Sequence, residues 1–230
     1  MAPGHPDLGG GEGAQAAATL FEGLRETGGV HPVLLSSIDR SWPALFKPGA
    51  HITAFDARPH QYLFLSHDID PLWHRNREPL LVEAYAEFLL LTAPGVVHFF
   101  DFATFGIELL SLTRRILPSC RIVVSFQDAL AICAADGSLV RRVDGTACNG
   151  ASPVRCHHCI PERTPEDMFL RARWMMAHLA AADVFIVPSA VLRGEYGRFG
   201  LPAERLVQLG TAGPPETMAS TYLALYRAPA

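Results

Sequence analysis

The sequence predicts an α/β protein with a doubly wound, mainly parallel sheet and a helix at its C-terminal end. Short buried strands alternate along the chain with amphipathic helices. A strand at 96–100, a helix at 105–117 and a strand at 121–126 follow one another within about thirty residues, which is the βαβ pattern. Such a unit requires a parallel strand pair with a right-handed crossover. Because 49% of the 230 residues are hydrophobic and 18% are charged, the chain can bury one large core or two small ones.

A glycine-rich loop opens the first expected helix. The run Gly9-Gly10-Gly11-Glu12 precedes apolar residues at helical spacing, and Gly28-Gly29 ends that helix. Such a loop can bind an anion, because free backbone N–H groups and the helix dipole both face the ligand. The alternative is an ordinary flexible loop with a helix cap, and no strand precedes the loop, although a phosphate-binding loop normally follows one.

The other expected elements follow in order. Thr164-Pro165-Glu166-Asp167 combines a capping residue, a proline at the first helical position and an acidic third residue, which predicts a helix start. The remaining expected strands are 31–36, 51–55, 62–65, 183–188 and 205–209, and the remaining helices are 79–91, 164–179, 190–199 and 216–227.

Histidine and acidic residues gather in the segment SHDIDPLWHRNR. His67, Asp68, Asp70 and His74 are metal-ligand types, but their loose spacing is more typical of a solvated turn. We therefore interpret this segment as a turn.

The segment 122–159 carries the most distinctive polar residues. Its strand ends in Gln127 and Asp128, and open α/β sheets place their ligand chemistry outside the carboxyl ends of the strands. We expect a site there, next to the loop excursion 129–163.

Four of the five cysteines lie in that excursion: Cys133, Cys148, Cys156 and Cys159. The last two form a C-x-x-C pair, a spacing that suits adjacent positions of a tetrahedral zinc site. The first two are separated by fourteen residues, unlike a standard zinc ribbon. A structural zinc and free or redox-labile thiols both remain open, whereas a thioredoxin-like function is disfavoured.

Charge and hydropathy argue against several classes of protein. A formal net charge of −4 argues against a nucleic-acid binder. No stretch reaches the roughly 18 apolar residues of a transmembrane segment. The first residues have neither a basic nor an apolar signal region, so we expect a cytoplasmic protein.

Several motifs in order resemble the N-terminal domain of family 4 glycosyltransferases, which are retaining enzymes of the GT-B fold. They are GGGE before a helix, VVHFFDF with GIELLSLTRRILP, IVVSFQDALAIC, DG-x-x-C with C-x-x-C, and ADVFIVPSAVLRGEYGRFGLPAERLVQLG. The last is the most specific. The resemblance implies that residues 1–211 form the Rossmann-like, acceptor-side half of a GT-B fold and that 212–230 form a helical tail.

The resemblance also implies a function and a set of site residues. The family transfers a sugar from a nucleotide-sugar donor to an acceptor hydroxyl on a sugar, glycan or lipid-linked molecule, and its chemistry requires no further cofactor. The implied donor-phosphate loop is Gly10, Gly11 and Glu12, and the implied residues of the acceptor side and cleft are His98, Asp101 and Ser189.

Two departures bear on activity. Gln127 and Asp128 stand where the family usually has His followed by Asp or Glu, and a carboxamide can only hydrogen-bond where an imidazole can exchange a proton. The nucleotide-binding second domain of the family has no counterpart in this sequence. Three hypotheses follow: a domain that is incomplete as an enzyme by itself, a binding or regulatory subunit that pairs with a separate nucleotide-binding chain, or an inactive remnant. Under each of these hypotheses we expect a cytoplasmic protein, and peripheral association with the inner membrane surface is the alternative.

Overall fold

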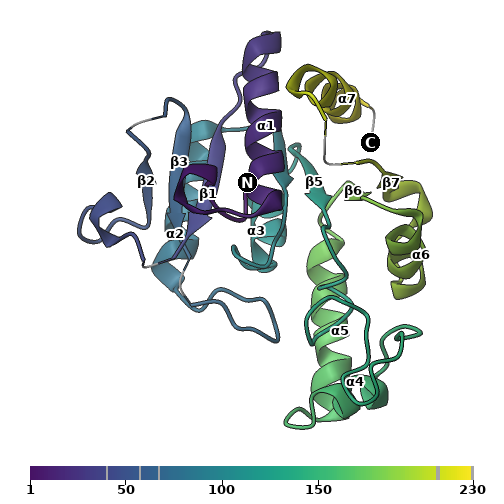
Figure 1. The fold of residues 1–230 in the computed structure, drawn as a ribbon. Helices are drawn as coiled ribbons and strands as arrows, with labels where there is room; N and C mark the ends of the chain where they lie inside the picture. Colours follow the sequence, from purple (N-terminus) through teal and green to yellow (C-terminus); the bar gives the residue numbers. More distant parts are fainter. Residues whose placement is uncertain (40, 57, 67, 211–212, 229–230) are drawn as a thin grey trace.

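The computed structural model describes residues 1–39, 41–56, 58–66, 68–210 and 213–228, and it confirms the α/β fold (Figure 1). The helices and strands alternate along most of the chain. In order they are α1 (Glu12–Thr27), β1 (Leu34–Ile38), β2 (Ile52–Ala54), β3 (Gln61–Leu65), α2 (Pro79–Thr92), β4 (Val96–Phe99), α3 (Glu108–Ile116), β5 (Arg121–Ser125), α4 (Pro153–Cys159), α5 (Pro165–Leu179), β6 (Val184–Val187), α6 (Ala190–Phe199), β7 (Leu206–Gln208) and α7 (Pro215–Arg227).

The strands are mainly parallel, as predicted. One set has the order β4-β5-β6-β7 with every pair parallel, and the other has the order β1-β3-β2, in which only β2 runs antiparallel. Met1 and Ala2 lie between β1 and β4 and hydrogen-bond to both, so the two sets form one continuous layer. The glycine loop therefore does follow a piece of strand, although that piece is only two residues long.

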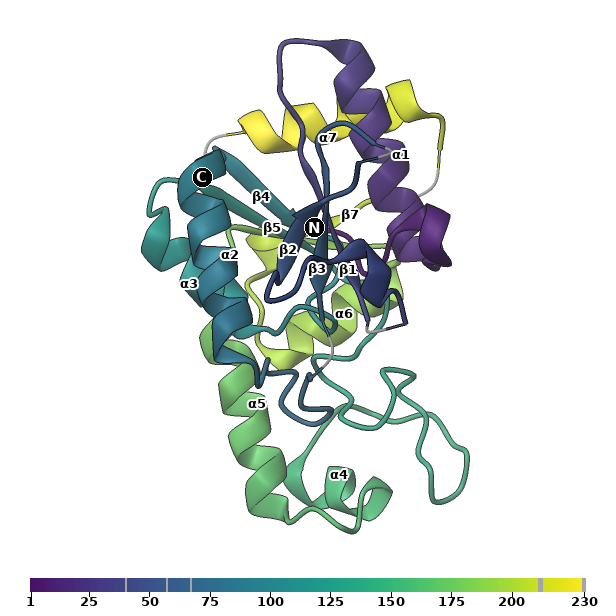
Figure 2. The same cartoon turned by 90° about the vertical axis from the view of Figure 1, so that its left-hand side faces the viewer.

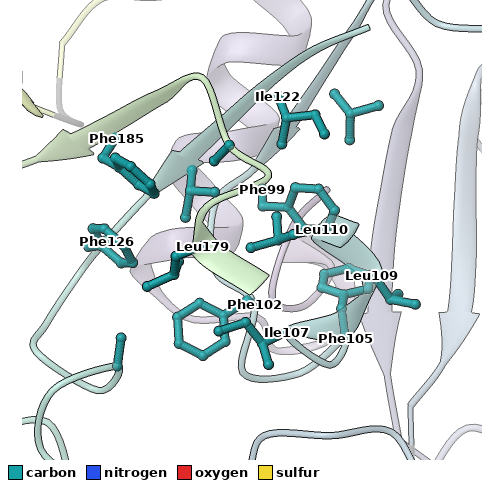
Figure 3. Packing of buried hydrophobic residues seen from close by; sticks show 14 of the residues in the cluster. Phe99, Phe102, Phe105, Ile107, Leu109, Leu110, Ile122, Phe126, Leu179 and Phe185 are labelled. Atoms are coloured by element: carbon teal, nitrogen blue, oxygen red, sulfur yellow. The ribbon is translucent and has the colours of Figure 1, made fainter. Parts of the chain in front are cut away.

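Helices cover both faces of this layer, which makes the fold doubly wound. Residues of β5 show the alternation: Val123 packs into a core with α1 and α7, whereas Ile122 and Val124 pack into a core with α2, α3, α5 and α6. In Figure 2, α7 crosses α1 on one side of the strands. Figure 3 shows part of the opposite core, where Phe126 stacks on Phe185 with ring centroids 5.6 Å apart.

Local sequence signals account for several element boundaries. The Oγ1 atom of Thr164 accepts the N–H of Asp167 at 3.2 Å, and the carboxylate of Asp167 accepts the N–H of Thr164 at 3.0 Å. This reciprocal capping starts α5 where the sequence predicted. By contrast, α3 begins at Glu108 and not at 105, because Gly106 has a φ of +101° that a helix does not accommodate.

The cysteine-bearing excursion contains one element that we did not predict. The helix α4 includes the C-x-x-C pair and packs beside α5, at the end of the molecule away from α1 and α7 (Figure 1). Among the described residues, no helix has the length and apolar character that a membrane crossing requires.

Candidate functional site

Polar side chains and a glycine loop gather at the carboxyl edge of the sheet. The chain leaves β4 toward Asp101, leaves β5 through Gln127 and Asp128, and leaves β6 toward Ser189. Because these strands are parallel, their carboxyl ends share one edge, and ligands of open α/β sheets bind there.

The glycine loop uses its glycines in two different ways. A Cβ at Gly10 would lie 2.6 Å from the Cβ of Ala14 and 2.9 Å from the carbonyl oxygen of His5, so close packing requires glycine there. A Cβ at Gly11 would meet no atom within 4 Å, so the space in front of that residue is open. Gly11 also caps α1 without a side chain, which leaves the N–H groups of the first turn available to a ligand.

The loop is held in place by His5, which the sequence reasoning missed. The Nδ1 atom of His5 accepts the N–H of Asp7 at 3.2 Å, and its Nε2 atom therefore donates to the Oε1 atom of Gln61 at 2.7 Å. The His5 ring is buried and packs edge-on against Phe55. No sequence motif marks this role, because Gln61 lies 56 residues further along the chain.

Gln127 lies beside the first turn of α1. Its Cγ atom is 3.9 Å from the position that a Cβ on Gly13 would take. Its Nε2 atom is buried and has no hydrogen-bond partner among the described residues. An unpaired buried amide donor costs about 1–3 kcal/mol, so a rotation of the partly exposed Gln127 side chain that brings this atom to a ligand oxygen is favoured.

Asp101 is a carboxyl whose pKa is raised by its surroundings. Its Oδ1 atom accepts the N–H of Ala103 at 2.9 Å, yet burial, together with the nearby charge of Asp128, raises its pKa to about 6. A carboxyl with a pKa near neutrality can both accept and donate a proton in the working pH range.

Asp128 has a mainly local role. Its Oδ1 atom accepts the N–H of Leu130 at 2.8 Å, and its carboxyl carbon would lie 2.9 Å from a Cβ on Gly137. Partial burial and the charge of Asp136 raise its pKa. The carboxylate thus fixes the turn that begins the excursion, and its charge acts on Asp101.

Ser189 lies at the strand-to-helix corner between β6 and α6, as the resemblance implied. Its Oγ atom accepts the N–H of Leu192 at 3.2 Å and caps α6. The capping interaction occupies the hydroxyl as an acceptor and leaves its hydrogen as the group that can meet a ligand.

His98, an implied acceptor-side residue, is the second-last residue of β4. His98 lies inside β4 with its side chain under α7, where its Nδ1 and Nε2 atoms are 2.7 Å from the Oη atom of Tyr226 and 2.8 Å from the Oγ atom of Ser125. Burial holds its pKa well below the usual range. Its ring therefore belongs to the core between β4 and α7.

The four cysteines of the excursion line one small cavity of about 20 Å³. All four are free thiols, and burial raises the pKa of the Cys156 thiol. Within the described part of the chain, no three His, Cys, Asp or Glu side chains are grouped as a metal ion requires. The zinc site stays a prediction, and the four cysteines border one cavity without forming such a group.

The histidine and acidic segment before α2 is a turn held by an ion-pair cluster. Asp68 lies 3.7 Å from a guanidinium nitrogen of Arg77, and Asp70 pairs with the same guanidinium. Asp70 also accepts the N–H groups of Leu72 and Trp73, which is the geometry of a capped turn. His67 of this predicted cluster lies outside the described residues.

Arg171 is a structural residue that the sequence reasoning missed. It lies on α5 with 2% of its surface exposed and donates to the carbonyl oxygens of Leu72, Ala131 and Leu130 at 2.7, 2.9 and 2.7 Å. Burial lowers its pKa to about 10. The sequence signal for this role was the position of Arg171 three residues after Met168, on the face of the helix that is buried. A buried guanidinium needs hydrogen-bond acceptors around it.

A mainly parallel sheet with helices on both faces and polar groups at its carboxyl edge defines a Rossmann-like α/β protein. No protein-family model, curated protein or solved structure matches the chain.

Proposed function

We propose that the chain binds a phosphorylated sugar, of the nucleotide-sugar type, at the carboxyl edge of its sheet. In this proposal it is the acceptor-side half of a family 4-like glycosyltransferase and does not complete sugar transfer by itself. The observation that carries the proposal is the unpaired amide of Gln127 beside the first turn of α1, which no side chain caps. Two sets of N–H donors at one place suit the oxygens of a phosphate.

Asp101 supports the part of the proposal that concerns the acceptor. Transfer of a sugar to a hydroxyl group requires a group that takes the hydroxyl proton. Asp101, with its pKa raised to about 6, can take that proton at neutral pH, whereas Gln127 can only orient the ligand. A lipid-linked acceptor would place this reaction at the inner surface of a membrane.

The test is thermal unfolding with UDP- and GDP-sugars, and with the free nucleotides. We expect a rise in Tm for the unmodified chain that Gln127→Glu abolishes, because the new carboxylate repels a phosphate. Asn149→Asp is the matched control: it also replaces an amide with a carboxylate, but at an exposed position of the cysteine-bearing excursion, and should keep the rise.

The outcomes separate the hypotheses. Absence of any Tm shift with every nucleotide sugar would remove the proposal. Turnover of a donor by the purified chain would show that the chain is complete as an enzyme. Binding without turnover, followed by turnover when a separate nucleotide-binding chain is added, would identify the chain as a subunit of a two-chain enzyme.

A further inference from the structure

A cavity of about 440 Å³ lies between β1 and β4, on the amino side of Met1. Its walls are mostly apolar. Leu20 and Phe21 of α1 and Leu223 of α7 line it from one face of the sheet, and Tyr85 and Leu89 of α2 line it from the other. The cavity therefore lies within the sheet layer and not on its surface.

Ala2 bonds to β1 as a parallel strand would. Its N–H group donates to the carbonyl oxygen of Leu35 at 2.8 Å, and its carbonyl oxygen accepts the N–H of Ser37 at 3.0 Å. A residue of one parallel strand placed between residues i and i+2 of its neighbour makes this pair of bonds.

Met1 bonds to β4 in the same way. Its amino group donates to the carbonyl oxygen of His98 at 2.6 Å, and its carbonyl oxygen accepts the N–H of Phe100 at 2.9 Å. Met1 and Ala2 are thus the carboxyl end of a central strand with parallel neighbours on both sides.

The register fixes which backbone groups come next along the two edges. In a parallel pair every second residue faces the same neighbour, so the next groups are the carbonyl of Val33 with the N–H of Leu35, and the carbonyl of Val96 with the N–H of His98. All four residues line the cavity. The cavity is therefore bordered by two strand edges in the correct register for a strand that continues from Met1.

We propose that an extended peptide segment, covalently joined to the amino end of Met1, fills this cavity as the central parallel strand between β1 and β4. The inference rests on the fold and is independent of the proposed function. The segment spans about four residues, because at about 3.3 Å per residue it would run beside the stretch from His98 back to Gly95. Its side chains are apolar on both faces, since α1 and α7 cover one face and α2 covers the other.

The Met1 amino group favours a covalently joined strand over a separate peptide. Burial lowers the pKa of this amine to about 5, so a charge is disfavoured at that place. A peptide bond to a preceding residue replaces the amine with a neutral N–H and keeps the bond to His98. A separate peptide would end against the amine and leave it buried.

The test compares three chains extended by four residues before Met1. One extension consists of valine and isoleucine, one of glycine and serine, and one repeats the apolar extension with proline at the two positions next to Met1, whose N–H groups the register requires. The apolar extension should raise Tm by roughly 5–10 °C, and the other two should not. Equal Tm values for all three would overturn the proposal.

Two further measurements keep the inference testable if an extended chain aggregates. Hydrogen exchange on the unextended chain should find the amides of Leu35 and His98 much less protected than those of Ser37 and Phe100, and equal protection would contradict an open strand position. The apolar segment added as a free peptide should give little stabilisation. A peptide effect as large as that of the extension, or a gain in Tm that is lost on dilution, would point to pairing between molecules and overturn the covalent assignment.

Discussion

Gly23 determines how closely α7 approaches α1. A Cβ at this position would lie 2.2 Å from the carbonyl oxygen of Pro215 and 3.2 Å from the Cβ of Ala219. The nearest of these atoms belongs to the backbone, so no side-chain rotation can relieve the contact. Gly23→Ala should therefore push the start of α7 away from α1.

The expected magnitude follows from two opposing effects. Replacing glycine by alanine inside a helix stabilises that helix by about 1 kcal/mol. Overpacking in a rigid contact costs typically about 1–3 kcal/mol, and lost burial of Met218, Tyr222 and Leu223 on α7 adds to that cost. We expect a net loss of roughly 1–3 kcal/mol in the free energy of unfolding, which lowers Tm by about 3–10 °C in a chain of this size.

Gly194→Ala is the matched control. Gly194 lies on the exposed side of α6, and a Cβ there would meet no atom within 4 Å. This variant should be stabilised by about 0.5–1 kcal/mol because only the helix propensity changes. Urea unfolding and limited proteolysis around α7 provide the measurements. The reasoning would be refuted if Gly23→Ala were as stable as Gly194→Ala and α7 stayed equally protected.

Three other predictions concern the amino end, the centre of α5 and the cysteines. The Met1 amine has a pKa of about 5 in the folded chain and 8.0 in the unfolded chain, so the unfolded chain binds the proton more readily. The free energy of unfolding should therefore rise by up to about 4 kcal/mol between pH 5 and pH 8. Urea titrations should find that this pH-dependent component is missing after N-terminal acetylation. Arg171→Lys should cost roughly 2–4 kcal/mol, because one ammonium group cannot serve three separated carbonyls, whereas Arg173→Lys at an exposed position of α5 should be neutral in the same assay. Elemental analysis of protein purified without chelators or added metal should decide between zinc and free thiols: about one zinc per chain, with much less in Cys156→Ser, would support the metal prediction, and zinc far below one equivalent would remove it.

Most of the fold could be predicted because its signals are local. Hydrophobic periodicity located the strands and long helices, and the capping sequence from Thr164 to Asp167 located the start of α5. The unpredicted α4 also has a local signal: Ser152 accepts the N–H of Arg155, and Pro153 occupies the first helical position. The cysteine spacing drew the interpretation toward a metal loop, although a C-x-x-C pair is equally compatible with one turn of helix.

The site could be predicted only in part, because strand ends are visible in a sequence and tertiary partners are not. Asp101 and Gln127 lie at the carboxyl edge, since each follows directly on a strand that the sequence shows. His98 lies on the same segment as Asp101, but its side chain points to the face that α7 covers. That outcome depends on Tyr226, which lies 128 residues further along the chain.

The identity of residue 127 changes which group at the strand ends can exchange a proton. A histidine beside Asp101 and Asp128 would be drawn toward its charged form by both carboxylates, and its charge would in turn lower the pKa of Asp101. Gln127 carries no charge, so the raised pKa of Asp101 reflects burial and the charge of Asp128 without a compensating cation from this position. The carboxamide thus supplies a hydrogen bond while the capacity for proton transfer lies on Asp101, one strand away. If the edge of this sheet carries out acid–base chemistry, its pH dependence should follow Asp101 and should be insensitive to replacement of Gln127 by asparagine.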